Sequence, residues 1–170
     1  MNVTLIGMAG AGKSYIGKRL AKRLGMGFID IDDCLKQTHG KGIQEILNEV
    51  GEEAYLEKEL QALINSTNGK NNLVISPGGS IIYRKECREY IKKISKVIHL
   101  YTPFETVETR LKGMPPRALI GMSEKTLKEL HDERTPMYES LADITINTEG
   151  KNAGAIVQEI VGFLSKEGKE

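Results

Sequence analysis

The sequence contains no tryptophan, few other aromatic residues, two cysteines and almost no net charge. Cys34 and Cys87 are too few for a disulfide framework and lack metal-ligand spacing, so a reducing cytoplasm fits them best. A net charge of +1 gives no long-range field, which argues against nucleic acid or an acidic membrane as a partner. No apolar run approaches the roughly 20 residues that a membrane helix needs. The function must therefore be sought in local motifs.

The length of 170 residues suits one domain with a substantial core, so we expect a single domain over residues 1–170. The N-terminal MNVTLIGMAGAG has no basic segment and runs directly into a motif, so we expect no signal peptide. His39, His99 and His131 are scattered through the sequence. We expect each of them at the surface or at a helix end rather than at a metal.

Short apolar runs alternate with helical patterns throughout the chain. The apolar runs predict strands at residues 3–6, 28–32, 73–76, 97–101 and 143–147. The helical patterns predict helices at 14–24, 33–66 (with breaks near His39 and Gly51), 103–111, from about 123 to 131 or beyond, and around Ile156, Ile160 and Leu164. This alternation predicts an α/β fold in which helices flank a five-stranded parallel sheet. We expect residues 33–66 to pack as a small side lobe.

The clearest motif is GMAGAGKS, from Gly7 to Ser14, which fits the phosphate-binding pattern G-x4-G-K-[ST]. Its glycines let backbone N–H groups turn toward phosphate oxygens, and the following helix adds its positive end. Lys13 would reach the β- and γ-phosphates, and the Ser14 hydroxyl would take one place on Mg²⁺. A glycine turn that spells the pattern by chance would not explain its place between a strand and a helix. We expect a nucleoside triphosphate to contact Gly10, Ala11, Gly12, Lys13, Ser14 and Tyr15.

Three aspartates crowd the end of the second predicted strand, in FIDIDD at residues 28–33. Ligands of an open parallel sheet bind beyond the carboxyl ends of its strands, where the phosphate loop and the Gly78-Gly79 pair also lie. The i, i+2 spacing would put Asp30 and Asp32 on the same side of the strand. One carboxylate could support Mg²⁺ and the other could accept a hydrogen bond from a substrate hydroxyl. Alternatively, Asp32 or Asp33 only caps a helix that starts near Cys34.

Taken in order, these motifs resemble those of the shikimate kinase family. GMAGAGKSYIGKRLAKRLGMGFIDID is similar to the opening of such a kinase, and GEEAYLEKE lies where the family has G-E-x-x-F-R-x-x-E. SPGGS resembles the glycine-rich substrate loop, PPRALI the arginine-bearing lid, ERTPMYESLAD the substrate-binding arginine segment and NTEGKNAGAIV the adenine loop. The resemblance implies a P-loop NTPase fold like that of nucleoside monophosphate kinases, with a mobile lid at residues 112–123 and a substrate-binding lobe at 33–66.

The same resemblance implies roles for individual residues. Asp30 would assist the metal with Ser14, and Asp32 would hold the acceptor hydroxyl beside Gly78 and Gly79. Arg117 would close over the phosphates, and Arg134 would bind a substrate carboxylate. Arg110 and Asn152 would flank adenine. The alternatives are a plain surface loop around Arg117 and helix-surface positions for Arg110 and Arg134, the latter paired with Glu133 or Glu139.

Three residues depart from the family pattern. Leu56 replaces an arginine that grips the substrate carboxylate, Pro77 precedes the glycines, and Ser80 stands where a third glycine is usual. Losing such a charge-assisted bond costs a few kcal/mol, around a hundredfold in affinity. Lys58 would point to a different helix face, although it or Arg84 could swing in as a replacement.

We therefore expect an ATP- and Mg²⁺-dependent kinase that phosphorylates a hydroxyl of shikimate or of a related compact hydroxylated acid. We further expect it to act as a cytoplasmic monomer, without a nucleic-acid or membrane partner. Two alternatives stay open: a nucleotide-binding sensor that has lost its acceptor, and a kinase for a nucleoside or nucleotide.

Overall fold

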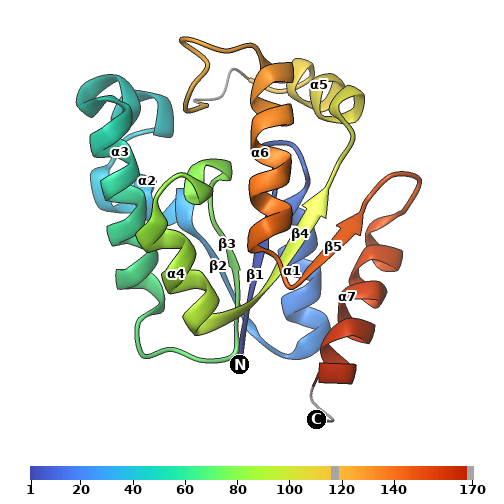
Figure 1. Cartoon of the computed structure of the whole chain (residues 1–170). Helices are drawn as coiled ribbons and strands as arrows, with labels where there is room; N and C mark the ends of the chain where they lie inside the picture. The colour runs from blue at the N-terminus through green and yellow to red at the C-terminus, as the bar shows by residue number, and fades with distance from the viewer. Residues whose placement is uncertain (116–118, 168–170) are drawn as a thin grey trace.

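A five-stranded parallel sheet forms the centre of the molecule. The structure is a computed structural model that describes residues 1–115 and 119–167. The strands are β1 (Asn2–Ile6), β2 (Gly27–Asp30), β3 (Leu73–Ser76), β4 (Ser95–Tyr101) and β5 (Ile144–Asn147). Every neighbouring pair is parallel, and the strand order is β2-β3-β1-β4-β5. The predicted α/β fold with a five-stranded parallel sheet is confirmed (Figure 1).

Helices connect and flank the strands. They are α1 (Lys13–Leu24), α2 (Ile31–His39), α3 (Ile43–Thr67), a short 3-10 helix η1 (Gly79–Ile82), α4 (Lys85–Ile94), α5 (Phe104–Lys112), α6 (Leu127–Leu141) and α7 (Ala153–Glu167). Helix α6 begins at Leu127 rather than near Ser123, because Thr126 and Glu129 form a capping box that fixes its first turn.

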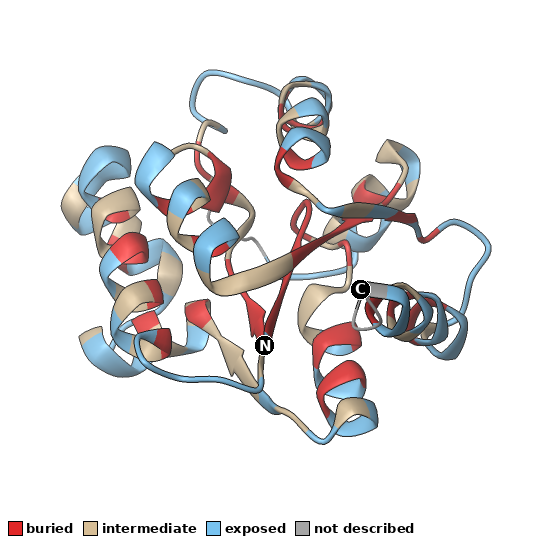
Figure 2. Cartoon of the chain, turned by 60° about the horizontal axis from the view of Figure 1, so that its bottom comes forward, coloured by how far each residue is buried: buried red, intermediate tan, exposed pale blue. Residues whose placement is uncertain are grey.

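The helices lie on both faces of the sheet. Side chains alternate along each strand, so that Val74 packs in a cluster with residues of α1 and α7. Its neighbour Ile75 packs in the opposite cluster, with residues of α3, α4 and α6. Figure 2 shows that buried residues concentrate in the strands and on the inner sides of the helices. This two-sided burial explains why the strands are short, apolar and without polar alternation.

The second strand ends earlier than expected. Helix α2 starts at Ile31, directly after β2, because the Asp30 side chain accepts hydrogen bonds from the backbone N–H groups of Asp32 and Asp33 and so caps the helix. The prediction that Asp30 and Asp32 share one side of a strand is therefore wrong, since Asp32 lies in the first turn of α2. The cap comes from Asp30, not from Asp32 or Asp33 as the alternative proposed.

Helices α2 and α3 pack against each other beside the sheet, on the left in Figure 1. Gly51 interrupts α3 with φ 81° and ψ 171°, at the break that the sequence predicts. The buried side chains between these helices are Leu35, Ile46 and Tyr55, and Ile120 from the segment before α6 joins them. This contact brings the end of the predicted lid against the predicted lobe.

Two of the three histidines are buried, contrary to expectation. His39 is the last residue of α2, as predicted, but His99 and His131 are almost fully buried. The two buried rings pack beside aromatic side chains, and His131 Nε2 lies 2.9 Å from the Thr102 carbonyl oxygen. Within the described ranges no cluster of histidine, cysteine and acidic residues could hold a metal by itself. No described helix is long and apolar enough to cross a bilayer.

Candidate active site

The phosphate loop joins β1 to α1 in a conformation that only glycine adopts easily. Gly10 and Gly12 have φ values of 80° and 89°, and Gly12 lies immediately before α1. The Lys13 ammonium donates hydrogen bonds to the carbonyl oxygens of Gly7 (2.8 Å) and Met8 (3.0 Å). The loop therefore presents backbone N–H groups, a helix N-terminus and a cation at one point, which suits a polyphosphate.

A cavity of about 500 Å³ opens beyond the carboxyl ends of the strands. Most of the predicted site residues line it, namely Gly10, Ala11, Gly12, Lys13, Ser14, Tyr15, Asp30, Asp32, Gly78, Gly79, Arg110 and Arg134. Asn152 does not line it, although its neighbours Lys151 and Ala153 do. Arg117 lies outside the described residues. The fold thus brings together groups that are far apart in the sequence.

Ser14, Asp30 and Ser76 meet at the ends of three adjacent elements. The Ser14 hydroxyl donates a hydrogen bond to Asp30 Oδ2 at 2.5 Å. The hydroxyl oxygens of Ser14 and Ser76 lie 3.4 Å apart. Hard oxygen ligands of this kind, with one carboxylate, suit Mg²⁺, which usually keeps several waters and takes one or two protein ligands plus phosphate oxygens. The donor set beside the phosphate loop therefore fits a magnesium ion.

The Gly78-Gly79 turn passes close to two carboxyl groups. A Cβ atom on Gly78 would lie 2.5 Å from Glu59 Oε1 and 3.2 Å from Asp32 Oδ1, so only glycine fits there. Glu59 is fully buried in α3, and its Oε2 accepts a hydrogen bond from the Ser80 hydroxyl at 2.9 Å. Burial first, and then the nearby Asp32 charge, raises the pKa of Glu59 to about 8. Asp32 therefore lies beside a buried carboxyl group whose pKa is raised.

Arg134 is the largest fully buried side chain, with 1% of its surface exposed. The alternative that it lies on a helix surface, paired with Glu133 or Glu139, is wrong. Its Nε donates to the Tyr83 hydroxyl (2.9 Å) and its Nη2 to the Ile120 carbonyl oxygen (2.6 Å). Its Nη1 would lie 3.2 Å from a Cβ atom on Gly79, at the wall of the cavity. Nε and Nη2 are thus held by Tyr83 and Ile120, the Tyr138 hydroxyl also hydrogen-bonds the guanidinium, and Nη1 lies beside the glycine turn.

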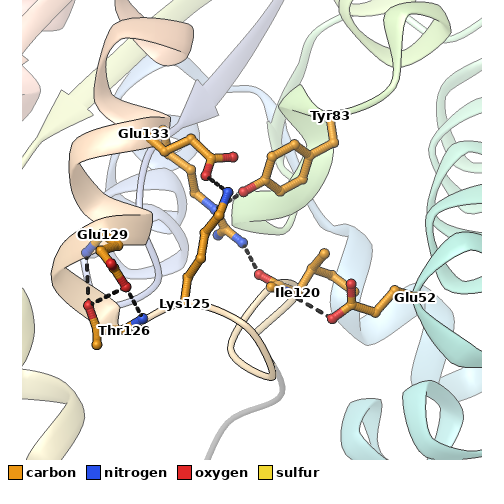
Figure 3. A network of polar contacts seen from close by, with 9 residues as sticks. Glu52, Tyr83, Ile120, Lys125, Thr126, Glu129 and Glu133 are labelled. Carbon is orange, nitrogen blue, oxygen red and sulfur yellow. Dashed lines mark hydrogen bonds and ion pairs between the residues drawn. The ribbon is translucent and has the colours of Figure 1, made fainter.

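The segment before α6 is tied down at several points, as Figure 3 shows. The Glu52 carboxylate accepts from the Gly121 N–H at 2.9 Å, and Lys125 pairs with Glu133. Tyr83, directly after η1, and Ile120, in the loop before α6, both accept hydrogen bonds from the Arg134 guanidinium. This end of the predicted lid is therefore bonded both to α3 and to α6.

Arg110 and Asn152 lie at the other end of the site. The Arg110 Nη1 donates to the Gly10 carbonyl oxygen at 2.8 Å, although its side chain is exposed. Asn152 caps α7 by accepting from the Ala155 N–H at 2.9 Å. Arg110 therefore lies across the phosphate loop, where an adenine ring could contact it, whereas Asn152 has a structural role already.

Among the residues that the structure describes, none near Leu56 replaces the expected arginine. Leu56 packs with the apolar cluster around Tyr55 and Ile120 and does not line the cavity. Lys58 does not line it either, and Arg84 is paired with Glu57 at 2.9 Å. Among the described lining residues, the cations are Lys13, Arg110, Arg134 and Lys151. Only Arg134 of these lies beside the glycine turn.

Sequence reasoning assigned no role to Glu59, although it ends the GEEAYLEKE stretch, or to Tyr83 and Tyr138. Tyr83 holds Arg134, and the Tyr138 hydroxyl donates to the Gly79 carbonyl oxygen at 2.6 Å. A glutamate at position 59 follows Leu56 by one helical turn, so it shares a helix face with the position of the missing arginine. That spacing could have identified Glu59. No pattern in the sequence points to the two tyrosines, which reach the site through tertiary packing.

The chain is similar to known shikimate kinases in both sequence and structure. The shikimate kinase of Persephonella marina is 42% identical over 163 residues, which are 96% of this chain and 98% of the relative. The solved shikimate kinase from Acinetobacter baumannii in complex with shikimate has a TM-score of 0.86 and 31% identity, covering 98% of this chain and 93% of that one. The deoxyadenosine kinase from M. mycoides with bound dATP has a TM-score of 0.58 and 14% identity, covering 97% of this chain and 100% of that one, and shows the fold alone.

The family model described as shikimate kinase matches residues 9–165, from the phosphate loop into the last helix. This match begins within the phosphate loop and includes all the later motifs that carry the predicted resemblance. The chain belongs to the shikimate kinase family.

Proposed function

We propose that this chain transfers the γ-phosphoryl group of ATP to a hydroxyl of shikimate or a closely related acid, as a cytoplasmic monomer. The observation that carries the proposal is the placement of the phosphate loop, Asp32 and Arg134 around one cavity. A nucleotide sensor would have no need of Asp32 and Arg134 at the far end of that cavity. A nucleoside kinase shares the fold, but the buried arginine beside the glycine turn suits a carboxylate better than a neutral base.

The phosphate end supplies positioning and positive charge. Lys13 now donates to the Gly7 and Met8 carbonyl oxygens, so it lies within reach of phosphate oxygens that enter the loop. Ser14 and Asp30 would hold Mg²⁺, which when bound neutralises charge on the β- and γ-phosphates. Phosphoryl transfer needs little covalent help from the protein, so positions and charges of this kind account for most of the catalysis.

The acceptor end would orient the hydroxyl and the carboxylate of the acid. Asp32 would accept the hydroxyl proton as the γ-phosphoryl group is transferred. Arg134 would bind the carboxylate through Nη1, which lies beside the glycine turn, while Tyr83, Tyr138 and the Ile120 carbonyl oxygen hold the guanidinium in place. Ile43, Leu47 and Tyr55 add an apolar wall from the α2–α3 lobe. With Leu56 in place of an arginine, this carboxylate has one cationic partner rather than two.

The remaining residues have supporting roles in the proposal. We assign residues 33–66 as the substrate-binding lobe and 112–123 as the lid of a single kinase domain. Arg117 would supply charge to the transferring phosphoryl group, and closure of the lid would exclude water. Arg110 would flank the adenine, and Asn152 would do so from the loop before α7, the helix that it caps.

The direct test is incubation with Mg-ATP and a panel of hydroxy acids, polyols and nucleosides. We expect ADP release that depends on shikimate, with a shikimate phosphate product detected by mass spectrometry. ATP binding without transfer to any member of the panel would support the sensor. Transfer to a nucleoside alone would support the nucleoside kinase.

The Lys13→Ala variant tests the phosphate site. We expect kcat to fall by about a hundredfold or more, because one charged contact to the transferring group is lost. A coupled ADP assay measures this, and Lys18→Ala on the outer side of α1 is the matched control. Wild-type turnover by Lys13→Ala would show that the phosphates do not bind in this loop.

A further inference from the structure

Glu59 is a buried carboxyl group that the reaction outlined above does not use. It has no exposed surface, and Ser80 is its only hydrogen-bond partner within the described part of the chain. Its Oε1 has none there, although it lies directly beneath Gly78. An ionised carboxylate in such a place would be strongly disfavoured. The role of Glu59 therefore depends on whether its carboxyl group is protonated or ionised.

The surroundings of Glu59 decide its charge. Asp32 and Glu59 approach the same side of Gly78, and their nearer oxygens lie within about 6 Å of each other, close enough for one negative charge to oppose the other. The Arg134 guanidinium attracts a charge on Glu59, and the Lys13 ammonium does so less. The uncharged groups that face it are the Ser80 hydroxyl and, at neutral pH, the side chains of Tyr55, Cys87 and Tyr138.

We propose that Glu59 is a positioning residue that stays protonated beside Asp32 and thereby leaves the Arg134 guanidinium available to an acceptor carboxylate. This inference rests on the proposed function, because it concerns how that same site holds its acid. Ionised Glu59 would be a buried counter-ion within the field of Arg134 and would compete with the acceptor for it. Ser80, one of the departures from the family pattern, fixes the carboxyl group to the glycine turn through its hydrogen bond to Oε2.

The competition predicts a pH dependence in substrate binding. As the pH rises through the pKa of Glu59, which is about 8, the KM for shikimate should rise about tenfold for each further pH unit while kcat changes little. The KM for ATP is the internal comparison and should rise less, because Lys13 influences Glu59 less than Arg134 does.

Two variants separate this proposal from a merely structural role. Glu59→Gln keeps the shape and cannot ionise, so its KM for shikimate should stay within about threefold of its neutral value up to about pH 9.5. Ser80→Ala removes a hydrogen bond that favours the ionised form, so its rise in KM should begin at higher pH than in the wild type. Loss of activity in Glu59→Gln at neutral pH, or a wild-type KM that is flat in pH, would overturn the proposal.

A measurement without turnover distinguishes this failure from that of the proposed function. Carbon-13 labelling of glutamate side chains, with Glu59→Gln to assign the signal, would give the titration of Glu59 by NMR. We expect a midpoint near 8, and a midpoint near that of an ordinary glutamate would refute the proposal. If the midpoint is near 8 but the protein transfers no phosphoryl group to shikimate, the proposed function fails and the protonated state of Glu59 stands.

Discussion

Asp30 and Asp32 are separated by a single residue, yet the helix that begins between them gives them different surroundings. Asp30 contacts Ser14 and caps α2, whereas Asp32 faces the glycine turn. We expect Asp32→Asn to lower kcat by about a hundredfold or more, because the proton acceptor is lost, with little change in ATP affinity.

We expect Asp30→Asn to raise the Mg²⁺ concentration needed for half-maximal activity instead, since asparagine keeps an oxygen for the cap but loses the charge. Metal titrations of the coupled assay and calorimetry of ATP binding measure both effects. Equal loss of ATP binding in the two variants would contradict this division of roles.

A substitution at Leu56 tests whether the acceptor carboxylate has Arg134 as its one cationic partner. Its side chain packs beside Tyr55 and Ile120 at the lobe, where a long side chain could extend toward the cavity. We expect Leu56→Arg to lower the KM for shikimate severalfold, because a second cation then meets the carboxylate. Steady-state kinetics measures this, with the uncharged Leu56→Met as control. An unchanged or higher KM would contradict this expectation and would mean that another cation already fills the role of the missing arginine.

At the scale of the element, Gly51 sets the direction of α3. Its φ and ψ values are accessible to glycine almost alone, and a Cβ there would meet no atom within 4 Å, so any cost of substitution comes from the backbone. We expect Gly51→Ala to lower the free energy of unfolding by about 1–3 kcal/mol.

Gly162 in α7 is the matched control for that substitution. It has ordinary helical backbone and open space around it, so Gly162→Ala should stabilise the protein by about 0.5–1 kcal/mol. Urea unfolding measures both changes. A stabilising Gly51→Ala would show that the break in α3 is not imposed by the backbone of this residue.

Sequence patterns predicted best the short apolar strands whose ends are marked by turns or charged residues. The stretches at 73–76 (LVIS) and 97–101 (VIHLY) contain three and four apolar residues and are bounded by turns or charges, and they lie in β3 and β4. The end of β2 was mistaken because Ile31 continues the apolar alternation of FIDID while the Asp30 side chain starts a helix. A local hydrogen bond there outweighs the pattern. The start of α6 was mistaken for the same reason, since the capping box follows the polar run that resembled a helix.

At the scale of the whole molecule, the strand order creates the site. Strands β2, β3 and β1 are neighbours, so Asp30, Ser76 and Gly7 end side by side although they are remote in sequence. Motifs predicted this meeting, because each follows a strand at its carboxyl end. They could not predict that Glu59 and Arg134 would be buried beneath the glycine turn, because both charges lie on helices whose packing is decided by distant apolar residues. Sequence patterns therefore gave no sign that these two ionisable side chains are buried.

This burial has a consequence for the stability of the whole protein. The pKa of Glu59 is raised from 4.5 to about 8 in the folded state, so its contribution to stability is fully present below about pH 4.5 and is lost as the pH rises through about 8. Between these values the unfolding free energy of the wild type should fall by about 1.4 kcal/mol per pH unit relative to Glu59→Gln.

Comparison of the two proteins isolates this contribution. The pKa of buried His99 is lowered from 6.5 to about 4, chiefly by desolvation, so its contribution is present above about pH 6.5 and is lost as the pH falls through about 4. That opposite slope occurs in both proteins and cancels in their difference, as do the surface carboxylates. Urea unfolding of wild type and Glu59→Gln at intervals of pH gives the difference directly. A difference that does not change across this range would show that Glu59 ionises as readily in the folded protein as in the unfolded chain, and the Arg134 guanidinium would then have a permanent buried counter-ion.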